Sequence, residues 1–445
     1  MPLPMKLHAN NRRNLMKRLP GGLILLTSAP EVIRNGDVHH QYRQSSNFLY
    51  LTGVEEPGYA LLLDPKRRAE TLFIPKLTQE HAVWLGHIPD LKEARKRFGA
   101  KHVAYIDELP SAIRAARKGY KLCHAEGPLP SEVRAALKGL KITKAELDDQ
   151  LCELRAFKSA DEVALIRAAN KATAAGHVAA MKAARPGMYE YEVQAELERE
   201  FLKAGAFHVG YGSIVAGGAS SGVLHYHHNN QKLKQGDLLL IDAGAEMHGY
   251  TADVTRTFPV SGKFTARQRD IYELVLAVQK HCIDRARPGV TSLELHKESE
   301  RVSAEGLRDL GLVRGSTDEL VESEVVRAFY PHGLSHMLGL DVHDVTGGKK
   351  RRIPVRRNGK LRYHARLEPG FVITMEPGLY FIPALLDDPA VRRKHKRRIN
   401  FEKTERYYNF GGIRIEDDIL VTAGKPKNLT VTPKSVEDIE SICSG

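Results

Sequence analysis

Two acidic residues stand near the ends of strand-like segments in the middle of the chain. In "LLLIDAGAEMHGYTADVTRTF" (238–258), four apolar residues lead into Asp242, and Asp253 follows eleven positions later. If the turn is centred on Met247–His248, an antiparallel hairpin places the two carboxylates opposite each other, with Cβ atoms roughly 5 Å apart. Carboxylates at that distance repel, so one is protonated unless a cation lies between them. An acidic turn at a sheet edge is the alternative, and the apolar run before Asp242 argues against it.

Two later segments with strand-like alternation each carry a glutamate. In "FVITMEPGLYF" (371–381), Glu376 falls on the face opposite Phe371, Ile373 and Met375. In "GGIRIEDDILV" (411–421), Arg414 and Glu416 share one face. A glycine-broken segment between the acidic pairs, "HGLSHMLGLDVHD", adds three histidines in twelve positions, whereas a lone histidine would more often be structural: His332, His336 and His343.

These residue types form a ligand set for metal ions. Two aspartates, two glutamates and one histidine offer mostly oxygen ligands with one imidazole, which suits divalent Mn, Co, Fe or Zn. Four buried carboxylates carry a charge that two divalent cations would cancel, and burying them without metal would be very costly. Two bridged metals, roughly 3.5–4 Å apart, would activate a shared water and polarise a carbonyl. The set therefore indicates metal-assisted hydrolysis.

The order of these residues, each within its own motif, resembles that of the pita-bread metallopeptidases. This family includes methionine aminopeptidase, aminopeptidase P and prolidase. The segment "YRQSSNFLYLTGVEEPGYALLLD" (42–64) resembles the N-terminal domain that aminopeptidase P and prolidase share. The resemblance implies an α+β fold, with a smaller N-terminal α/β domain followed by a pita-bread catalytic domain.

The resemblance also implies a role for each ligand. Asp242 is expected to chelate one metal, and His336 with Glu376 the other. Asp253 and Glu416 are expected to bridge the two. Glu376 is also the expected general base for the bridging water. The implied cofactors are two divalent metal ions, with Mn²⁺ preferred and Zn²⁺, Co²⁺ or Fe²⁺ as alternatives.

Further residues match the catalytic and substrate-binding positions of the family. His225 in "VLHYHHNN", His332 and His343 resemble the histidines that steady the substrate and the tetrahedral intermediate. Tyr211 matches a tyrosine of the substrate pocket. On residue type alone, His225 would be taken for a surface histidine, since two more histidines follow it within three positions.

One arginine favours the prolidase branch of the family. The insertion that ends in "KLRYHARLEPG" resembles the prolidase segment in which an arginine, here Arg362, binds the free carboxylate of a C-terminal proline. A guanidinium binds a carboxylate with two parallel hydrogen bonds. The expected reaction is therefore hydrolysis of Xaa-Pro dipeptides. The alternatives are an Xaa-Pro aminopeptidase acting on longer peptides, a non-catalytic binding protein on the same fold, and an ordinary surface role for Arg362.

Length and local pattern predict two domains. A chain of 445 residues exceeds one ordinary core. Strand-like runs ("LILLTS", "NFLYLTG", "YALLLD", "ETLFIP") alternate with helical stretches in the first 150 residues. A long amphipathic helix follows, with a capping box of Ser159 and Glu162. We expect an N-terminal domain over 1–153 and a catalytic domain over 154–445.

Composition and charge restrict the partners. No apolar run approaches the roughly 20 residues that a membrane helix needs. The four cysteines form no C-x-x-C pair, which favours a reducing cytoplasm. Much of the net charge of +13 lies in basic runs at 349–362 and 391–398, which we interpret as solvated surface rather than a specific nucleic-acid site. The segment "TLFIPKLTQEHAVWLG" (71–86) resembles a prolidase region that reaches a partner subunit, so a homodimer is expected.

Overall fold

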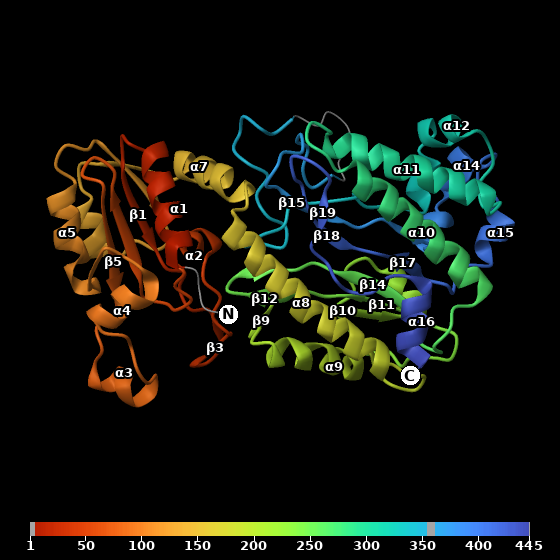
Figure 1. Cartoon of the computed structure of the whole chain (residues 1–445), viewed down its shortest axis with the longest axis horizontal. Helices are drawn as coiled ribbons and strands as arrows, with labels where there is room; N and C mark the ends of the chain where they lie inside the picture. The colour runs from red at the N-terminus through yellow and green to blue at the C-terminus, as the bar shows by residue number, and fades with distance from the viewer. Residues whose placement is uncertain (1–4, 354–360, 445) are drawn as a thin grey trace. The chain divides into compact units, whose positions relative to one another are not determined.

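The computed structural model describes residues 5–353 and 361–444. The chain divides into two compact units. The first comprises Met1–Arg155 with Gly347–Lys350, and the second comprises Ala156–Thr346 with Arg351–Gly445. Figure 1 labels the elements of both.

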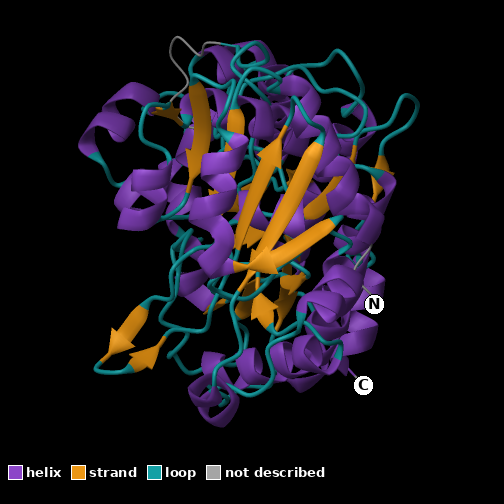
Figure 2. Ribbon diagram, turned by 90° about the vertical axis from the view of Figure 1, so that its left-hand side faces the viewer, coloured by secondary structure: helices purple, strands orange, loops and turns teal. Residues whose placement is uncertain are grey.

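The first unit is built on a six-stranded mixed sheet. The middle strands β1, β4 and β5 run antiparallel, while β7 lies parallel to β1 and β6 lies parallel to β5. Helices pack around this sheet (Figure 2), and α5 and α6 share an apolar core with β1, β4 and β5. In sheet order the strands are β6 (His102–Tyr105), β5 (Ala69–Ile74), β4 (Ala60–Asp64), β1 (Leu23–Thr27), β7 (Leu122–Glu126) and β8 (Lys141–Thr143).

Short helices and one hairpin complete this unit. The helices are α1 (Met5–Arg18), α2 (Ser46–Thr52), α3 (Gln79–Trp84), α4 (Leu91–Phe98), α5 (Leu109–Ala116), α6 (Ser131–Ala136) and α7 (Ala145–Ala156). The hairpin pairs β2 (Ile33–Asn35) with β3 (Val38–His39). The segment Gly347–Lys350 is held to α7, because the backbone N–H of Gly348 donates to Glu153 Oε2 at 3.0 Å.

The prediction that "NFLYLTG" is a strand was wrong, because this segment forms α2. Five consecutive residues, 48–52, are buried, so the run is apolar without alternation. Such a short run is compatible with either a buried strand or a buried helix. Gly53 favours the helix because it can end it in a left-handed C-cap. It adopts φ +69°, and its N–H donates to Leu49 O.

The second unit packs small antiparallel sheets against long helices. One three-stranded sheet contains β10 (Ile214–Gly217), β11 (Leu238–Asp242) and β14 (Thr255–Pro259). A second contains β13 (Tyr250–Thr251), β12 (Ala245–Met247) and β9 (His208–Val209). A third contains β15 (Val372–Met375), β18 (Asp417–Leu420) and β19 (Lys427–Asn428). A two-stranded sheet pairs β16 (Gly378–Tyr380) with β17 (Gly412–Arg414).

The helices of this unit flank the sheets (Figure 1). Contacts join α8 (Ala160–Ala183) to β12 and β13, α9 (Glu190–Lys203) to β10, and α10 (Ala266–Arg285) to β15, β16 and β17. The remaining helices are α11 (Ser292–Asp309), α12 (Thr317–Glu322), α13 (Pro383–Leu386), α14 (Pro389–His395), α15 (Phe401–Glu405) and α16 (Val436–Ser444). The predicted capping box at the start of α8 is confirmed: Ser159 Oγ accepts from Glu162 N–H, and Glu162 Oε2 accepts from Ser159 N–H.

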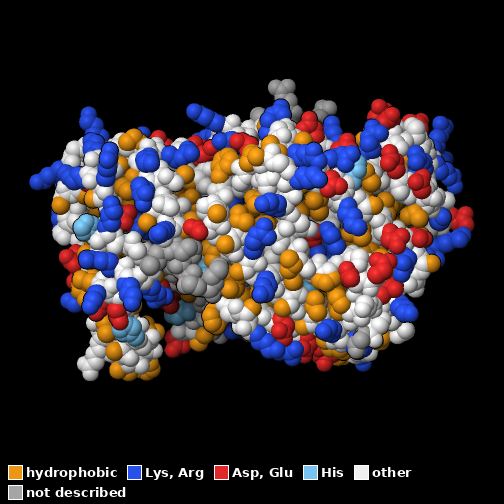
Figure 3. Space-filling view, viewed as in Figure 1, with side chains coloured by type: hydrophobic (Ala, Val, Ile, Leu, Met, Phe, Trp, Pro, Cys, Tyr) orange, Lys and Arg blue, Asp and Glu red, His pale blue; other side chains and the backbone are white. Residues whose placement is uncertain are grey.

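The basic run at 391–398 lies around α14, and three of its cations form ion pairs with acidic side chains. Arg392 pairs with Asp387 at 2.5 Å, Lys394 with Glu324 at 3.3 Å and Arg398 with Glu319 at 3.0 Å. Figure 3 shows basic and acidic side chains interspersed on the face in view. Residues 354–360 of the other basic run lie outside the described residues.

The helices and the cysteines give two further observations. Within residues 5–353 and 361–444, no helix combines the length and apolar character that crossing a bilayer requires. The four cysteines are free thiols rather than disulfides.

Candidate active site

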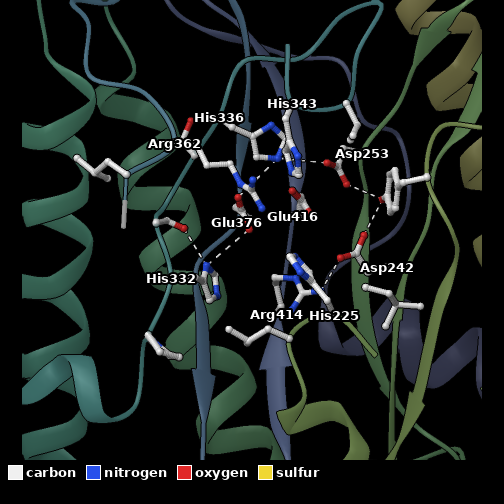
Figure 4. Close-up of a pocket in the computed structure, with 18 of the residues that line it drawn as sticks. His225, Asp242, Asp253, His332, His336, His343, Arg362, Glu376, Arg414 and Glu416 are labelled. Carbon is white, nitrogen blue, oxygen red and sulfur yellow. Dashed lines mark hydrogen bonds and ion pairs between the residues drawn. The ribbon is translucent and has the colours of Figure 1, made fainter. Parts of the chain in front are cut away.

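One cavity of about 640 Å³ in the second unit gathers all of the predicted site residues. Figure 4 shows their side chains converging on its centre from several strands and loops. The cavity is lined by Tyr211, His225, Asp242, Asp253, His332, His336, His343, Arg362, Glu376 and Glu416, together with Arg414 and apolar residues such as Ile214, Leu224 and Val342.

Three of the predicted ligands form a compact buried cluster. Asp253, His336 and Glu416 each offer a ligand atom within 4.8 Å of the others. His336 Nδ1 donates to the Met337 carbonyl at 3.0 Å, which turns Nε2 toward the carboxylates. His336 Nε2 lies 3.3 Å from Asp253 Oδ2 and 3.7 Å from Glu376 Oε1. This geometry suits a cation held by mixed oxygen and imidazole ligands.

Asp242 and Asp253 lie on one hairpin, but not directly opposite each other. The predicted turn at Met247–His248 was wrong by one position: Met247 pairs with Tyr250, so the turn is His248–Gly249, with φ values of +50° and +81°. Asp242 consequently pairs with Thr255. Asp253 is two residues along, which keeps it on the same face because side chains alternate with period two.

A tyrosine joins these two aspartates. The hydroxyl of Tyr211 lies 2.6 Å from Asp242 Oδ1 and 2.5 Å from Asp253 Oδ1. The single phenolic proton lies between two acid groups, and burial, with the charges of Asp242 and Asp253, raises the pKa of Tyr211 well above its usual value. Burial raises the pKa of Asp253, against the lowering effect of its hydrogen bond with His336. Tyr211 thus contacts both aspartates of the hairpin and fixes the distance between their carboxylates.

Arg414 lines the cavity, although it was not among the predicted site residues. Its side chain is 4 % exposed, and Nη2 pairs with Asp242 Oδ2 at 2.5 Å. Nη1 donates to the Tyr380 hydroxyl at 2.8 Å, and Nε donates to Thr255 Oγ1 at 3.1 Å. The alternation in "GGIRIEDD" already placed Arg414 on the face of Glu416. A cation is not a metal ligand, however, so a search for ligand types passed over it.

The Arg414 network continues to His332. The hydroxyl of Tyr380 lies 2.9 Å from His332 Nε2, while His332 Nδ1 lies 2.8 Å from the Gly333 carbonyl. The second contact requires the proton on Nδ1, so Nε2 accepts from the tyrosine. Burial, with the charge of Arg414, lowers the pKa of His332 to about 3. The imidazole is therefore neutral at physiological pH.

The electrostatics of the carboxylates call for additional positive charge. Burial and the charge of Asp253 raise the pKa of Glu416 well above its usual range. Burial raises the pKa of Glu376 to about 7. Burial alone would lower the pKa of His336, but its hydrogen bond with Asp253 and the charge of Glu376 raise it to about 9. Four acids crowd around one guanidinium and one imidazole, a donor set that fits two divalent cations.

A second group of residues lies on the open side of the cavity. The rings of His336 and His343 are 4.5 Å apart at 85°. Burial, with the charges of His336 and Arg362, lowers the pKa of His343 to about 4. Burial, then Arg362, also lowers the pKa of His225. Figure 4 shows Arg362 extending from the rim toward Glu376. This side therefore offers neutral imidazoles and one cation to a substrate.

The fold and this site define a metallopeptidase. Residues 164–423 match Metallopeptidase family M24, and residues 8–123 match the Aminopeptidase P, N-terminal domain. The chain therefore belongs to the M24 metallopeptidases, with the two-domain pita-bread architecture.

Relatives of two kinds resemble the chain over its whole length. An Xaa-Pro dipeptidase from Homo sapiens is 34 % identical and covers 100 % of this chain and 94 % of its own length. An Xaa-Pro aminopeptidase from Escherichia coli is 37 % identical, with 97 % and 96 % covered. Pseudomonas aeruginosa aminopeptidase PepP superposes with a TM-score of 0.85 at 35 % identity, covering 100 % and 98 % of the two chains. A zinc-substituted E. coli aminopeptidase P with bound product gives 0.86 at 34 %, with 100 % and 99 % covered.

Proposed function

We propose that this protein hydrolyses the Xaa-Pro bond of dipeptides. The observation that supports a dipeptide rather than a longer substrate is the position of Arg362. Its side chain lines the cavity beside the carboxylate cluster. Its charge acts on both His225 and His343, so a substrate held between those histidines has a guanidinium within reach. In a dipeptide, the proline that follows the scissile bond carries a free carboxylate, which a guanidinium binds well.

Two divalent cations, proposed to be Mn²⁺, would activate a water molecule and polarise the scissile carbonyl when bound. We assign Asp242, Asp253, His336, Glu376 and Glu416 to hold them. Zn²⁺, Co²⁺ and Fe²⁺ suit the same donors. Metal analysis of freshly purified protein tests both the identity and the number of the ions.

The remaining steps fall to side chains of the chain itself. Glu376 takes the proton of the attacking water, a role that suits a carboxylate that lines the cavity with Oε1 3.7 Å from His336 Nε2. His225 and His343 orient the substrate and donate hydrogen bonds to the oxygen that becomes negative during attack. His332 lies beside that group; because the Gly333 carbonyl and the Tyr380 hydroxyl engage both of its ring nitrogens, we assign it to shape the adjoining wall of the cavity against the substrate.

A comparison of two substrates tests the proposal. We expect faster hydrolysis of Ala-Pro than of Ala-Pro-Ala, because only the dipeptide presents a carboxylate one residue past the scissile bond. Arg362→Ala should raise KM for Ala-Pro about 10- to 100-fold, the range for a lost charged hydrogen bond, and change KM for Ala-Pro-Ala much less. Arg366→Ala is a matched control, because this exposed arginine of the same segment donates to the Gly289 carbonyl.

The second candidate function is an Xaa-Pro aminopeptidase of longer peptides. The 37 % identity to the E. coli Xaa-Pro aminopeptidase favours it. Equal or faster cleavage of Ala-Pro-Ala, with equal effects of Arg362→Ala on both substrates, would establish this function in place of dipeptide hydrolysis.

We further propose a homodimer that works in the cytoplasm. Val83, Trp84 and Leu85, at the end of α3, are 71 %, 78 % and 74 % exposed, and such apolar clusters favour protein contacts. Four free thiols suit a reducing compartment. Sedimentation analysis of the protein and of Trp84→Ser tests the dimer, which the substitution should weaken.

A further inference from the structure

A buried ion pair lies directly behind the histidine segment of the cavity. Lys158 Nζ is 2.9 Å from Asp344 Oδ2, and each side chain is 1 % exposed. Lys158 precedes α8, whereas Asp344 follows His343 in the chain. Neither residue lines the cavity.

Asp344 closes the loop that connects His336 to His343. Its backbone N–H donates to the Met337 carbonyl at 2.9 Å, and its Oδ1 accepts from the Val345 N–H at 2.8 Å. The loop has no room for a side chain at Gly339, where a Cβ would lie 2.0 Å from Asp344 Oδ2 and 2.8 Å from Lys158 Cε. The ammonium group therefore fills the inside of this loop.

Lys158 and the loop that contains Asp344 are both hydrogen-bonded to the segment at the start of β15. The backbone N–H of Lys158 donates to the Gly370 carbonyl at 2.8 Å, just before β15. On the loop side, Leu338 N–H donates to Val372 O and Thr374 N–H donates to His336 O, each at 2.9 Å. A displacement of the ion pair would thus move the loop relative to β15. His336 would keep its backbone hydrogen bond to β15, and His343 would shift with the other end of the loop.

The nearby carboxylate of Glu162 is already engaged. It accepts from Ser159 and, at 3.0 Å, from the Tyr250 hydroxyl. A buried ion pair adds little net stability over an apolar pair of the same volume, but it fixes a distance and a direction. The contribution expected of Lys158 and Asp344 is therefore geometric.

We propose that Lys158 and Asp344 are positioning residues that set the place of the His343 imidazole relative to His336. This inference rests on the proposed function, which gives His343 its part in binding the oxygen of the transition state. Small displacements of such a group are costly to the rate.

The test is the double variant Lys158→Met/Asp344→Asn. It removes both charges together, leaves no unpaired buried charge, and keeps an acceptor for Val345 N–H. We expect kcat for Ala-Pro to fall about tenfold, with KM within about twofold and the metal content unchanged. In a His343→Ala background, the same double substitution should change kcat less than about twofold, since the group it positions is gone.

A readout without catalysis accompanies these rates. Amide hydrogen exchange of residues 337–345 should be at least about tenfold faster in the double variant. Tyr250→Phe is the matched control: it removes a buried hydrogen bond at the same end of α8, and neither kcat nor the exchange of this loop should change. If the double variant does not fold, Asp344→Glu, which keeps both charges but changes their separation, is examined in the same way.

An equal loss of kcat in both backgrounds, or an unchanged kcat, would overturn the inference. If the wild-type protein cleaves no Xaa-Pro substrate, the proposed function fails. Hydrogen exchange alone then tests the positioning role of Lys158 and Asp344. Unchanged exchange of 337–345 in the double variant would then refute the positioning role, and faster exchange would support it.

Discussion

Single side chains of the cavity orient one another. Asp242 is paired with Arg414, and Tyr211 connects Asp242 to Asp253. Thr255 Oγ1 donates to Glu416 Oε2 at 2.7 Å and accepts from Arg414. Asp242, Asp253 and Glu416 therefore each have a protein partner that fixes the orientation of the carboxylate, as expected of residues that must present oxygen atoms to a cation.

Replacing Asp253 by asparagine should abolish activity. The amide keeps the volume but removes a charge from the cluster with His336 and Glu416, so fewer cations should be retained. We expect kcat to fall at least about 1,000-fold and the metal content to drop below two per chain. Elemental analysis and the Ala-Pro assay measure these effects, with the exposed Asp309→Asn as control. Retention of both metals and of activity would remove Asp253 from the ligand set.

Replacing Arg414 by methionine should lower kcat by about 10- to 100-fold. The substitution removes the partner of Asp242 and the donor to Tyr380, so Asp242 and His332 lose their orientation. Steady-state kinetics on Ala-Pro measures the effect. The exposed Arg397→Met should leave kcat unchanged. A wild-type rate for Arg414→Met would mean that the network contributes only to packing.

At the scale of elements, helix α8 brings a titratable group into the core. His177 is fully buried, and its Nε2 lies 3.3 Å from the Ala243 carbonyl, next to the end of β11. Burial, with the charge of Arg256, lowers its pKa to about 4. The unfolded chain therefore binds a proton at a higher pH than the folded chain does.

This difference predicts a pH dependence of stability. The contribution of neutral His177 is complete above pH 6.5 and is lost as the pH falls from there through about 4. The loss should approach roughly 3 kcal/mol. Urea unfolding of metal-free protein between pH 7 and 4 measures it. His177→Gln should show a shallower dependence, and an identical slope in the two proteins would contradict the assignment.

The same elements show how far sequence reasoning reaches. The capping box at Ser159 was predictable because it is local. The register of the Asp242 hairpin was not, because Met247–His248 and His248–Gly249 are equally plausible turns until strand packing chooses one. Helix α2 was missed because its buried run has no periodicity. Arg414 was missed because its role depends on Asp242, far away in the sequence.

At the scale of the whole molecule, the two units have separate apolar cores. The proposed metal ligands lie only in the second. Chelation should therefore destabilise that unit selectively, since a ligand bound only by the folded form stabilises it, by about 4 kcal/mol at 1,000 times Kd. Hydrogen exchange with and without chelator should accelerate in β11, β15 and β18, but not in β1 and β4. Equal acceleration in both units would refute this.

The proposed ligands enter the chain in a fixed order, from Asp242 on β11 to Glu416 just before β18. A ribosome has exposed the first two acids long before it makes the last, so a growing polypeptide carries only part of the coordination sphere. The full set of proposed ligands therefore exists only once synthesis has passed position 416. A nonsense codon anywhere ahead of position 416 yields a product that lacks the Glu416 carboxylate, however well its amino-terminal portion folds.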